Sequence, residues 1–172
     1  MASKASKRIT SPLAEKLFHN GTQIAEDHEV TFPNLQPVTE SISVMGTIDI
    51  PLRGLFQDME FSVKLNGITK HYGEITTPGE MHTFEHRWVD DHIGSDGSQK
   101  FVGKKVFLSG LLKSSGAPNT KLGENTELEC TYTCIRYKLV DDGKTVIDFD
   151  RFAKKCIVNG KNYYEDLDKY LR

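Results

Sequence analysis

One string in the sequence has residue types and spacing that match a metal-dependent active site, His82-Thr83-Phe84-Glu85-His86. In the H-x-x-E-H string of zinc peptidases, two histidines four residues apart share one face of a helix and bind one ion. Here Phe84 and Trp88 alternate with the two histidines at the period of a strand. Four residues along a strand separate the imidazoles by about 13 Å. We therefore expect no metal at this string and no catalytic role for His82 or His86.

No other group of residues predicts catalysis. The sequence contains no Walker A string, no G-x-G-x-x-G and no G-x-S-x-G. Of the three cysteines, Cys130 and Cys134 lie in a segment that reads as extended, which puts them too far apart for a disulfide or a shared zinc ion. We expect them and Cys156 to be reduced and packed in the core. The sequence thus predicts no enzyme activity, no catalytic or metal-binding residues and no cofactor.

The elements that would position any site belong to a chain of 172 residues, which is the size of one domain. We assign residues 13–172 to that domain and residues 1–12 to a flexible N-terminal tail. The formal net charge is −2, which argues against a protein that grips nucleic acid by neutralising its phosphates. No apolar run exceeds three residues, so we expect no insertion into a membrane.

Alternation of apolar and polar residues predicts a mainly β fold. The clearest strand covers residues 58–65, where the odd-numbered side chains are apolar and the even-numbered ones are polar. Further strands are expected at 38–44, 82–89, 104–112 and 127–139, the last with a bulge where its polar side changes. Asn20-Gly21 predicts a type I′ turn between strands at 13–19 and 23–32. With a late hairpin and a terminal helix at 165–171, we expect seven or eight strands and one or two short helices.

Residues 46–57 interrupt the alternation. Two glycines, Pro51 and the lack of a clear period over twelve residues indicate a long arm between two strands. The arm contains five apolar side chains and no pattern that would bury them all on its own core, which is typical of a segment that awaits a partner.

Three expected strands carry polar stripes, formed by Thr39, Ser41 and Ser43, by Glu60, Ser62 and Lys64, and by Glu127, Glu129, Thr131 and Thr133. Such strands would make an open sheet with exposed edges, and natural proteins close or cover these. Identical subunits can close them by joining their sheets into one large barrel whose lumen the stripes face. A monomeric β-sandwich with one solvated sheet fits the same alternation.

The order of features over residues 32–61 resembles the major tail tube proteins of contractile-tailed bacteriophages and related phage-tail-like bacteriocins. These features are Phe32-Pro33-Asn34-Leu35, a strand containing Thr39-Glu40, the segment Gly46-Thr47-Ile48-Asp49-Ile50-Pro51, a turn at Gly54 and a strand containing Met59. The last hairpin and the helix ending at Leu171 are also similar. Residues 44–45 and 64–66 depart from the family pattern.

The resemblance implies a β-sandwich or partly open barrel subunit that joins its neighbours into a ring-shaped barrel. Hexameric rings would stack into the rigid inner tube of a contractile tail or tailocin, the conduit for DNA delivery through the cell envelope. The arm would couple one ring to the next through Gly46, Ile48, Asp49, Ile50, Pro51, Leu52, Arg53, Gly54, Leu55 and Phe56. The lumen would be lined by the three polar stripes and by the strand at 104–112.

The implied partners are further copies of the chain, the tail sheath, and the baseplate, tape-measure and tail-terminator proteins. The location would be a virion tail or tailocin particle assembled in the bacterial cytoplasm. Phage DNA is expected to pass without specific binding, because Glu60, Glu127 and Glu129 outnumber Lys64 on the stripes. Two other readings stay open, the tube of a type VI secretion or extracellular contractile injection system and a monomeric binding β-sandwich.

Overall fold

The computed structural model describes residues 9–67, 70–94 and 96–171. This part of the chain forms twelve strands and two short helices, which confirms the mainly β fold. The strands are β1 (Ile9–His19), β2 (Thr22–Ala25), β3 (His28–Thr31), β4 (Pro37–Ser43), β5 (Thr47–Phe56), β6 (Glu60–Asn66), β7 (Met81–Ile93), β8 (Gln99–Ser115), β9 (Glu127–Asp141), β10 (Lys144–Asp150), β11 (Lys155–Val158) and β12 (Lys161–Asn162). The helices are α1 (Tyr72–Ile75) and α2 (Glu165–Tyr170).

The number of strands exceeds the expected seven or eight because several are too short to show alternation. Strands β2, β3 and β11 have four residues each, and β12 has two. The predicted strand at 23–32 is two strands, β2 paired with β1 and β3 paired with β6. The turn that separates them contains Asp27, whose carboxylate accepts a hydrogen bond of 2.7 Å from the Asn66 amide.

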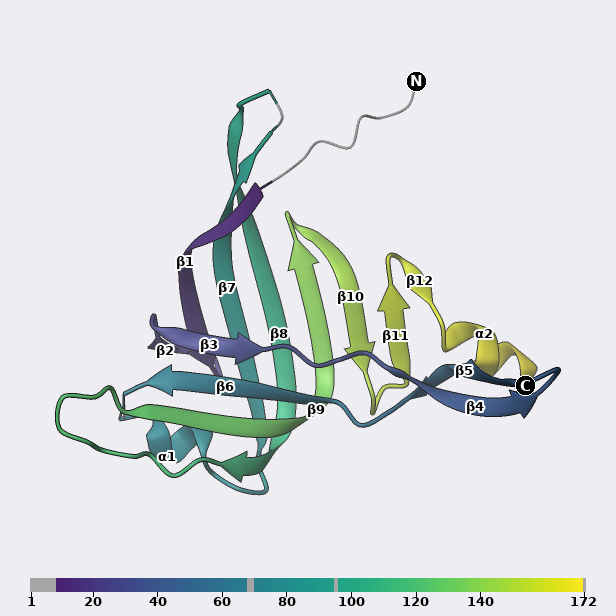
Figure 1. The fold of residues 1–172 in the computed structure, drawn as a ribbon, viewed down its shortest axis with the longest axis horizontal. Helices are drawn as coiled ribbons and strands as arrows, with labels where there is room; N and C mark the ends of the chain where they lie inside the picture. Colours follow the sequence, from purple (N-terminus) through teal and green to yellow (C-terminus); the bar gives the residue numbers. More distant parts are fainter. Residues whose placement is uncertain (1–8, 68–69, 95, 172) are drawn as a thin grey trace.

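Ten strands form one antiparallel sheet that folds over itself. Its main path runs β12-β11-β10-β9-β8-β7-β1-β2, and β6 and β3 branch from β9. Figure 1 shows the long strands β1, β7 and β8 upright, with β3, β6 and the first part of β9 crossing in front of them and β10 upright to one side. The sheet is open, not a closed barrel, and this arrangement of crossing layers is consistent with a β-sandwich.

The fold-over occurs in β9, at the bulge that the sequence predicted. Ser109 pairs with Arg136 and Gly110 pairs with Cys134, so Ile135 is an extra residue in the ladder. Cys134 and Ile135 are consecutive and both buried, which explains the change of polar side. Before the bulge β9 pairs with β6, and after it with β10.

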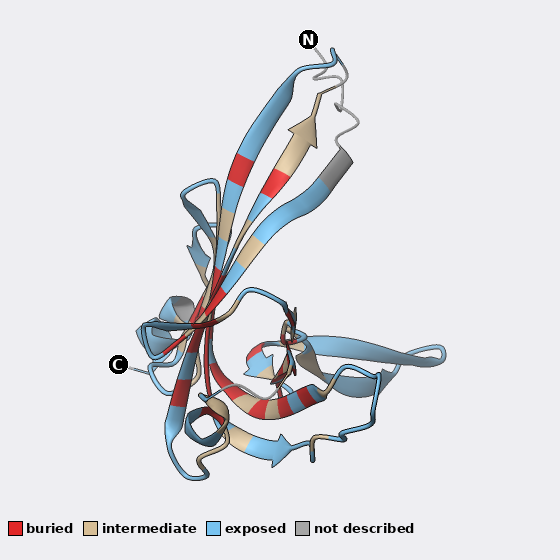
Figure 2. Cartoon of the chain, turned by 90° about the vertical axis from the view of Figure 1, so that its left-hand side faces the viewer, coloured by how far each residue is buried: buried red, intermediate tan, exposed pale blue. Residues whose placement is uncertain are grey.

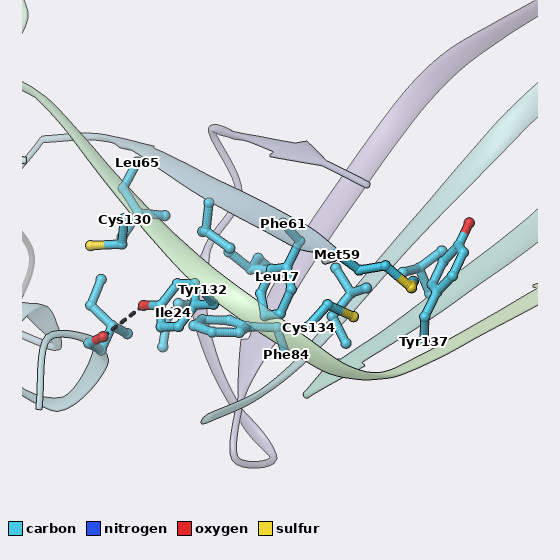
Figure 3. Close-up of a cluster of buried hydrophobic side chains, with 14 of the residues drawn as sticks. Leu17, Ile24, Met59, Phe61, Leu65, Phe84, Cys130, Tyr132, Cys134 and Tyr137 are labelled. Carbon is cyan, nitrogen blue, oxygen red and sulfur yellow. Dashed lines mark hydrogen bonds between the residues drawn. The ribbon is translucent and has the colours of Figure 1, made fainter. Parts of the chain in front are cut away.

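The core lies where the two layers meet. The apolar residues of β6, together with Met59 just before it, are 1% exposed, as their alternation predicted. They pack with Leu17, Phe84 and Tyr132 (Figure 3). The Tyr132 hydroxyl donates a hydrogen bond of 2.6 Å to the Ile75 carbonyl and so ties α1 to the core. Figure 2 shows that buried residues concentrate at this junction and that the distant ends of the long strands are exposed.

The three cysteines are free and buried, as expected. Burial raises the pKa of the Cys134 thiol to about 12, which keeps it protonated and unreactive at neutral pH. These thiols therefore act as small apolar side chains.

The first hairpin has the predicted turn, with Asn20 at φ 47° and Gly21 at φ 86°. Strand β1, however, begins at Ile9 and not near residue 13. Residues 9–12 pair with 90–93 of β7, so this part of the expected tail belongs to the sheet. The rest of the predicted tail, residues 1–8, lies outside the described part of the chain.

Most of the predicted arm is strand β5, so it is not an unpaired segment, although its register with β4 shifts between Pro51 and Phe56. Strand β5 pairs with β4 in a separate two-stranded sheet, with Ile42 opposite Ile48 and Glu40 opposite Ile50. The period was hidden because Pro51 and Gly54 fall within the strand. As Figure 1 shows, the β4–β5 hairpin projects from the body of the molecule beyond β10 and β11.

Candidate assembly surfaces

The β4–β5 hairpin is amphipathic. Its register puts Ile42, Ile48 and Ile50 on one face, because opposed residues in a pair of strands share a face and alternate residues return to it. Ser41 and Asp49 are opposed on the other face, where the Ser41 hydroxyl donates to the Asp49 carboxylate. The hairpin therefore presents an apolar stripe and a polar stripe.

Large apolar side chains of this segment are exposed. Val44 and Met45 at the turn are 61% and 108% exposed, and Ile48 is 50% exposed. The other exposed large apolar residues of the segment are Ile42, Ile50 and Leu55. The turn is sharp, with Met45 at φ 51° and Gly46 at φ 135°, a conformation that favours glycine at position 46. A projecting element with an apolar face is typical of a protein interaction site.

The base of the hairpin is fixed to the body. The Phe56 ring packs edge-on against Phe149 of β10, with ring centroids 5.4 Å apart. The Arg151 guanidinium donates a hydrogen bond of 2.8 Å to the Gln57 carbonyl. Gly54, at φ 80°, lies against α2, where a Cβ would come within 3.0 Å of Leu167. The body thus holds the base of the hairpin and leaves its tip free of the core.

A second surface is the polar face of β6 and the first half of β9. The register opposes Glu60 to Thr133, Ser62 to Thr131 and Lys64 to Glu129. All seven predicted side chains from these two strands therefore lie on one face. The alternation of polar and apolar residues in these two strands is thereby confirmed.

Ion pairs connect this face. Lys64 Nζ lies 2.9 Å from Glu127 Oε2, and the hydrogen bond to Glu127 raises the pKa of Lys64. Lys113 of β8 pairs with Glu60, which likewise raises the pKa of the lysine. Both lysines are thus engaged by carboxylates.

The sequence missed two members of this face, Glu29 and Thr31. They lie opposite Lys64 and Ser62 because β3 is the outer neighbour of β6. Their own alternation is too short to read, and only the pairing of β3 with β6 reveals them.

The remaining residues predicted to line the lumen do not lie on the polar face of β6 and β9. Thr39, Ser41 and Ser43 lie on the β4–β5 hairpin, which belongs to a different sheet from β6 and β9. The predicted strand at 104–112 is part of β8 and pairs mainly with the second half of β9, beyond the bulge. The structure therefore brings together seven of the ten predicted side chains.

The two histidines of the H-x-x-E-H string lie on β7, as expected, and each meets a different histidine. His82 Nδ1 is 3.0 Å from His19 Nε2, and His86 Nδ1 is 2.8 Å from His28 Nε2. All four rings are buried. Burial lowers the pKa of His19 and of His86 to about 4 and also lowers that of His28, so these three rings are neutral at pH 7.

Of the two pairs, the second has a carboxylate within 4.0 Å among the described residues. Glu15 Oε2 lies 4.0 Å from His28 Nε2 and 3.9 Å from His86 Nε2. Among the described residues, these three form the one group of at least three His, Cys, Asp or Glu side chains close enough to hold an ion. The sequence did not single out Glu15 or His28, because they come from β1 and β3 and have no spacing relation to His86.

Comparison with known proteins gives one family. The model of a family described as phage tail tube protein FII matches residues 14–171. A search of curated proteins finds no match. No helix in the described ranges combines the length and the apolar character needed to cross a membrane.

Proposed function

Because the chain belongs to the phage tail tube protein FII family, we propose that it is the structural subunit of the rigid inner tube of a contractile phage tail or tailocin. In this proposal hexameric rings of the chain stack into the tube, and the tube is the conduit through which DNA crosses the cell envelope. The observation that carries the proposal is the β4–β5 hairpin, which exposes an apolar stripe on a projection held at its base by the body of the subunit.

The hairpin supports stacking of one ring on the next. Its Ile42, Ile48 and Ile50 side chains are 37%, 50% and 42% exposed, and complete burial of a side chain of this size contributes about 1.5–3 kcal/mol. Because the two strands are already paired, little chain order has to be created on contact, which favours association. Repetition around a ring would make the contact multivalent.

The open sheet supports ring formation. On β1 only Leu17, Phe18 and His19 pair with β2, so residues 9–16 have a free edge opposite β7 within the described chain. A second copy can add its own edge strand there by main-chain hydrogen bonds. Repeated head-to-tail, such contacts close a ring when the rotation per subunit is 60°.

The polar face of β3, β6 and β9 is our proposed lining of the lumen. Four carboxylates, those of Glu29, Glu60, Glu127 and Glu129, outnumber the two ammonium groups of Lys64 and Lys113. A lining with excess negative charge repels the phosphates of DNA and does not retain the passing strand.

The same proposal gives the partners and the location. In the particle the tube would lie inside a tail sheath and contact baseplate, tape-measure and tail-terminator proteins. Assembly would take place in the bacterial cytoplasm, and the finished location is a virion tail or tailocin particle.

A paired substitution on the two faces of the hairpin tests the stacking role. The double variant Ile42→Ser/Ile48→Ser removes the opposed apolar pair, and Ser43→Ala/Thr47→Ala changes the neighbouring opposed pair on the other face. We expect both proteins to fold like the parent by circular dichroism, because all four side chains are exposed. The isoleucine variant should need at least about tenfold higher concentration to form tubes in electron micrographs, equivalent to about 1.4 kcal/mol. Equal polymerisation of both variants would contradict the proposal.

A further inference from the structure

We propose that Glu15, His28 and His86 form a binding site for one divalent transition-metal ion of the Zn²⁺ type, which fastens β3 to β1 and β7. The site lies apart from the β4–β5 hairpin and from the polar face of β3, β6 and β9, while Glu15 belongs to the β1 segment whose main-chain edge we propose for ring contacts. It also differs from the H-x-x-E-H reading, because His82 takes no part in it and two of its three ligands come from other strands.

Register explains how three distant residues converge. Leu17 lies opposite His86 and Glu15 lies opposite Trp88, so Glu15 is the diagonal neighbour of His86 on the inward face of β1 and β7. His28 reaches the same point from β3, which belongs to the crossing layer. The site thus bridges the two layers of the fold.

The distances suit an ion after a small movement. Ligands at about 2.0–2.2 Å from a tetrahedral ion are about 3.3 Å from one another. The Glu15 carboxylate is 4.0 Å and 3.9 Å from ring nitrogens of His28 and His86. The Glu15 side chain is 34% exposed, so it has room to close these gaps of about 0.6–0.7 Å. Two imidazole nitrogens and one carboxylate oxygen are the donor set of several zinc centres, and a water molecule would complete the shell.

The first histidine pair, His19 and His82, is a comparison within the same core, because its hydrogen bonds are complete without an ion. His82 Nε2–H donates a hydrogen bond of 2.8 Å to the Thr77 carbonyl, so His82 Nδ1 accepts from His19 Nε2–H at 3.0 Å. Each nitrogen of that contact thus has a defined protein partner, and among the described residues no carboxylate lies close enough to complete a group of three ligands there.

In the second pair, His28 and His86, one ring nitrogen has no such hydrogen-bond partner. Among the described residues, buried His28 Nδ1 has no partner at hydrogen-bond geometry, and the contact within the pair joins His28 Nε2 to His86 Nδ1 at 2.8 Å. An ion at this point would take the lone pair of His28 Nε2, so the present contact of that nitrogen with His86 Nδ1 would be replaced by the bond to the metal. Two aromatic rings restrict the movement of the His86 ring. The Trp88 ring stacks on it with centroids 4.8 Å apart, and the Phe32 ring is tilted against it with centroids 6.1 Å apart.

The experiment measures zinc and cobalt binding by the full-length chain, prepared with chelator and then dialysed against ZnCl₂ or CoCl₂ alone. We expect one ion per chain, a visible Co²⁺ absorption typical of a four-coordinate site, and a rise in the unfolding temperature with Zn²⁺ concentration. The test variant is Glu15→Gln, which keeps the size of a half-buried side chain. It should lower the affinity at least about tenfold and abolish the thermal shift.

His19→Gln is the matched control, because it changes the other histidine pair and should retain the ion, the Co²⁺ spectrum and the thermal shift. A parent chain that binds no zinc would overturn the proposal. Binding that Glu15→Gln leaves unchanged, or that His19→Gln abolishes equally, would also overturn it.

Discussion

At the scale of single residues, the unusual feature is a set of four buried histidines within a largely apolar core. His19 is 4% exposed and is faced by His82, Phe84 and, at longer range, by the charges of His71 and Glu74. Burial is the main cause that lowers the pKa of His19 to about 4 from 6.5, with the neighbouring His82 acting in the same direction. The folded protein therefore takes up this proton at lower pH than the unfolded chain does.

The stability of the subunit should consequently fall in mild acid. The contribution of His19 is fully present above pH 6.5 and is lost as the pH falls toward about 4, where the unfolded chain alone binds the proton. We expect a loss on the order of 2–3 kcal/mol over this range from this residue. His19→Gln keeps an N–H donor for His82 and removes the titration. Urea unfolding between pH 4 and 7 should show a slope against pH that is smaller by about one proton near pH 5. An unchanged slope would show that His19 is not the titrating group.

At the scale of elements, the bulge in β9 decides the shape of the subunit, because it lets one strand belong to both layers. Gly110 lies opposite the bulge, and a Cβ there would come within 2.3 Å of the Thr133 carbonyl oxygen and 2.9 Å of the Phe61 ring. Neither group can move away, since one is backbone and the other is in the core. Glycine is thus required at this position of β8.

Gly110→Ala should therefore destabilise the subunit by about 3 kcal/mol or more, through overpacking against backbone. Gly103→Ala is the control on the same strand, because a Cβ at Gly103 meets nothing within 4 Å. It should leave the free energy of unfolding within about 0.5 kcal/mol of the parent or raise it. Denaturant unfolding of both variants measures the difference, and equal stabilities would mean that β8 and β9 are not packed as described.

How well each element follows from the sequence depends on its length and on what faces it. Strand β6 alternates cleanly because one of its faces meets the core and the other meets solvent. The faces of its residues follow correctly from the sequence, although the strand begins at Glu60 and not at residue 58. The same reasoning found the bulge in β9. It could not find β3 as a neighbour of β6, since four residues give no period and pairing is a long-range property. It also mistook β5 for an arm outside any strand, because Pro51 and Gly54 interrupt the alternation that Ile48 and Ile50 begin.

For the candidate sites too, the sequence shows which residues share a face of one strand but not which strands lie side by side. Seven polar side chains of β6 and β9 were found by their stripes, and the register brings them together. Thr39, Ser41 and Ser43 have an equally good stripe, but alternation does not say which sheet a strand joins. Glu15 and His28 were not found at all, because only the crossing of the two layers places them beside His86.

At the scale of the whole molecule, the proposed lumen face has a charge that should let DNA pass. Tubes of the parent chain are expected to retain no DNA at physiological salt, because carboxylates predominate on this face. Glu60→Lys/Glu129→Lys reverses the balance and should create DNA binding that weakens steeply as salt rises. Filter retention of labelled DNA by purified tubes measures both. Equal retention by parent and variant would show that this face does not line the lumen.

The most direct test of the tube assignment is electron microscopy of the purified chain over a range of concentrations. Our proposal predicts rings with sixfold symmetry at low concentration and stacks of these rings, with the β4–β5 hairpin reaching the adjacent ring, as the concentration rises. Particles that remain single subunits at every concentration, or rings whose hairpins contact no neighbouring ring, would contradict it.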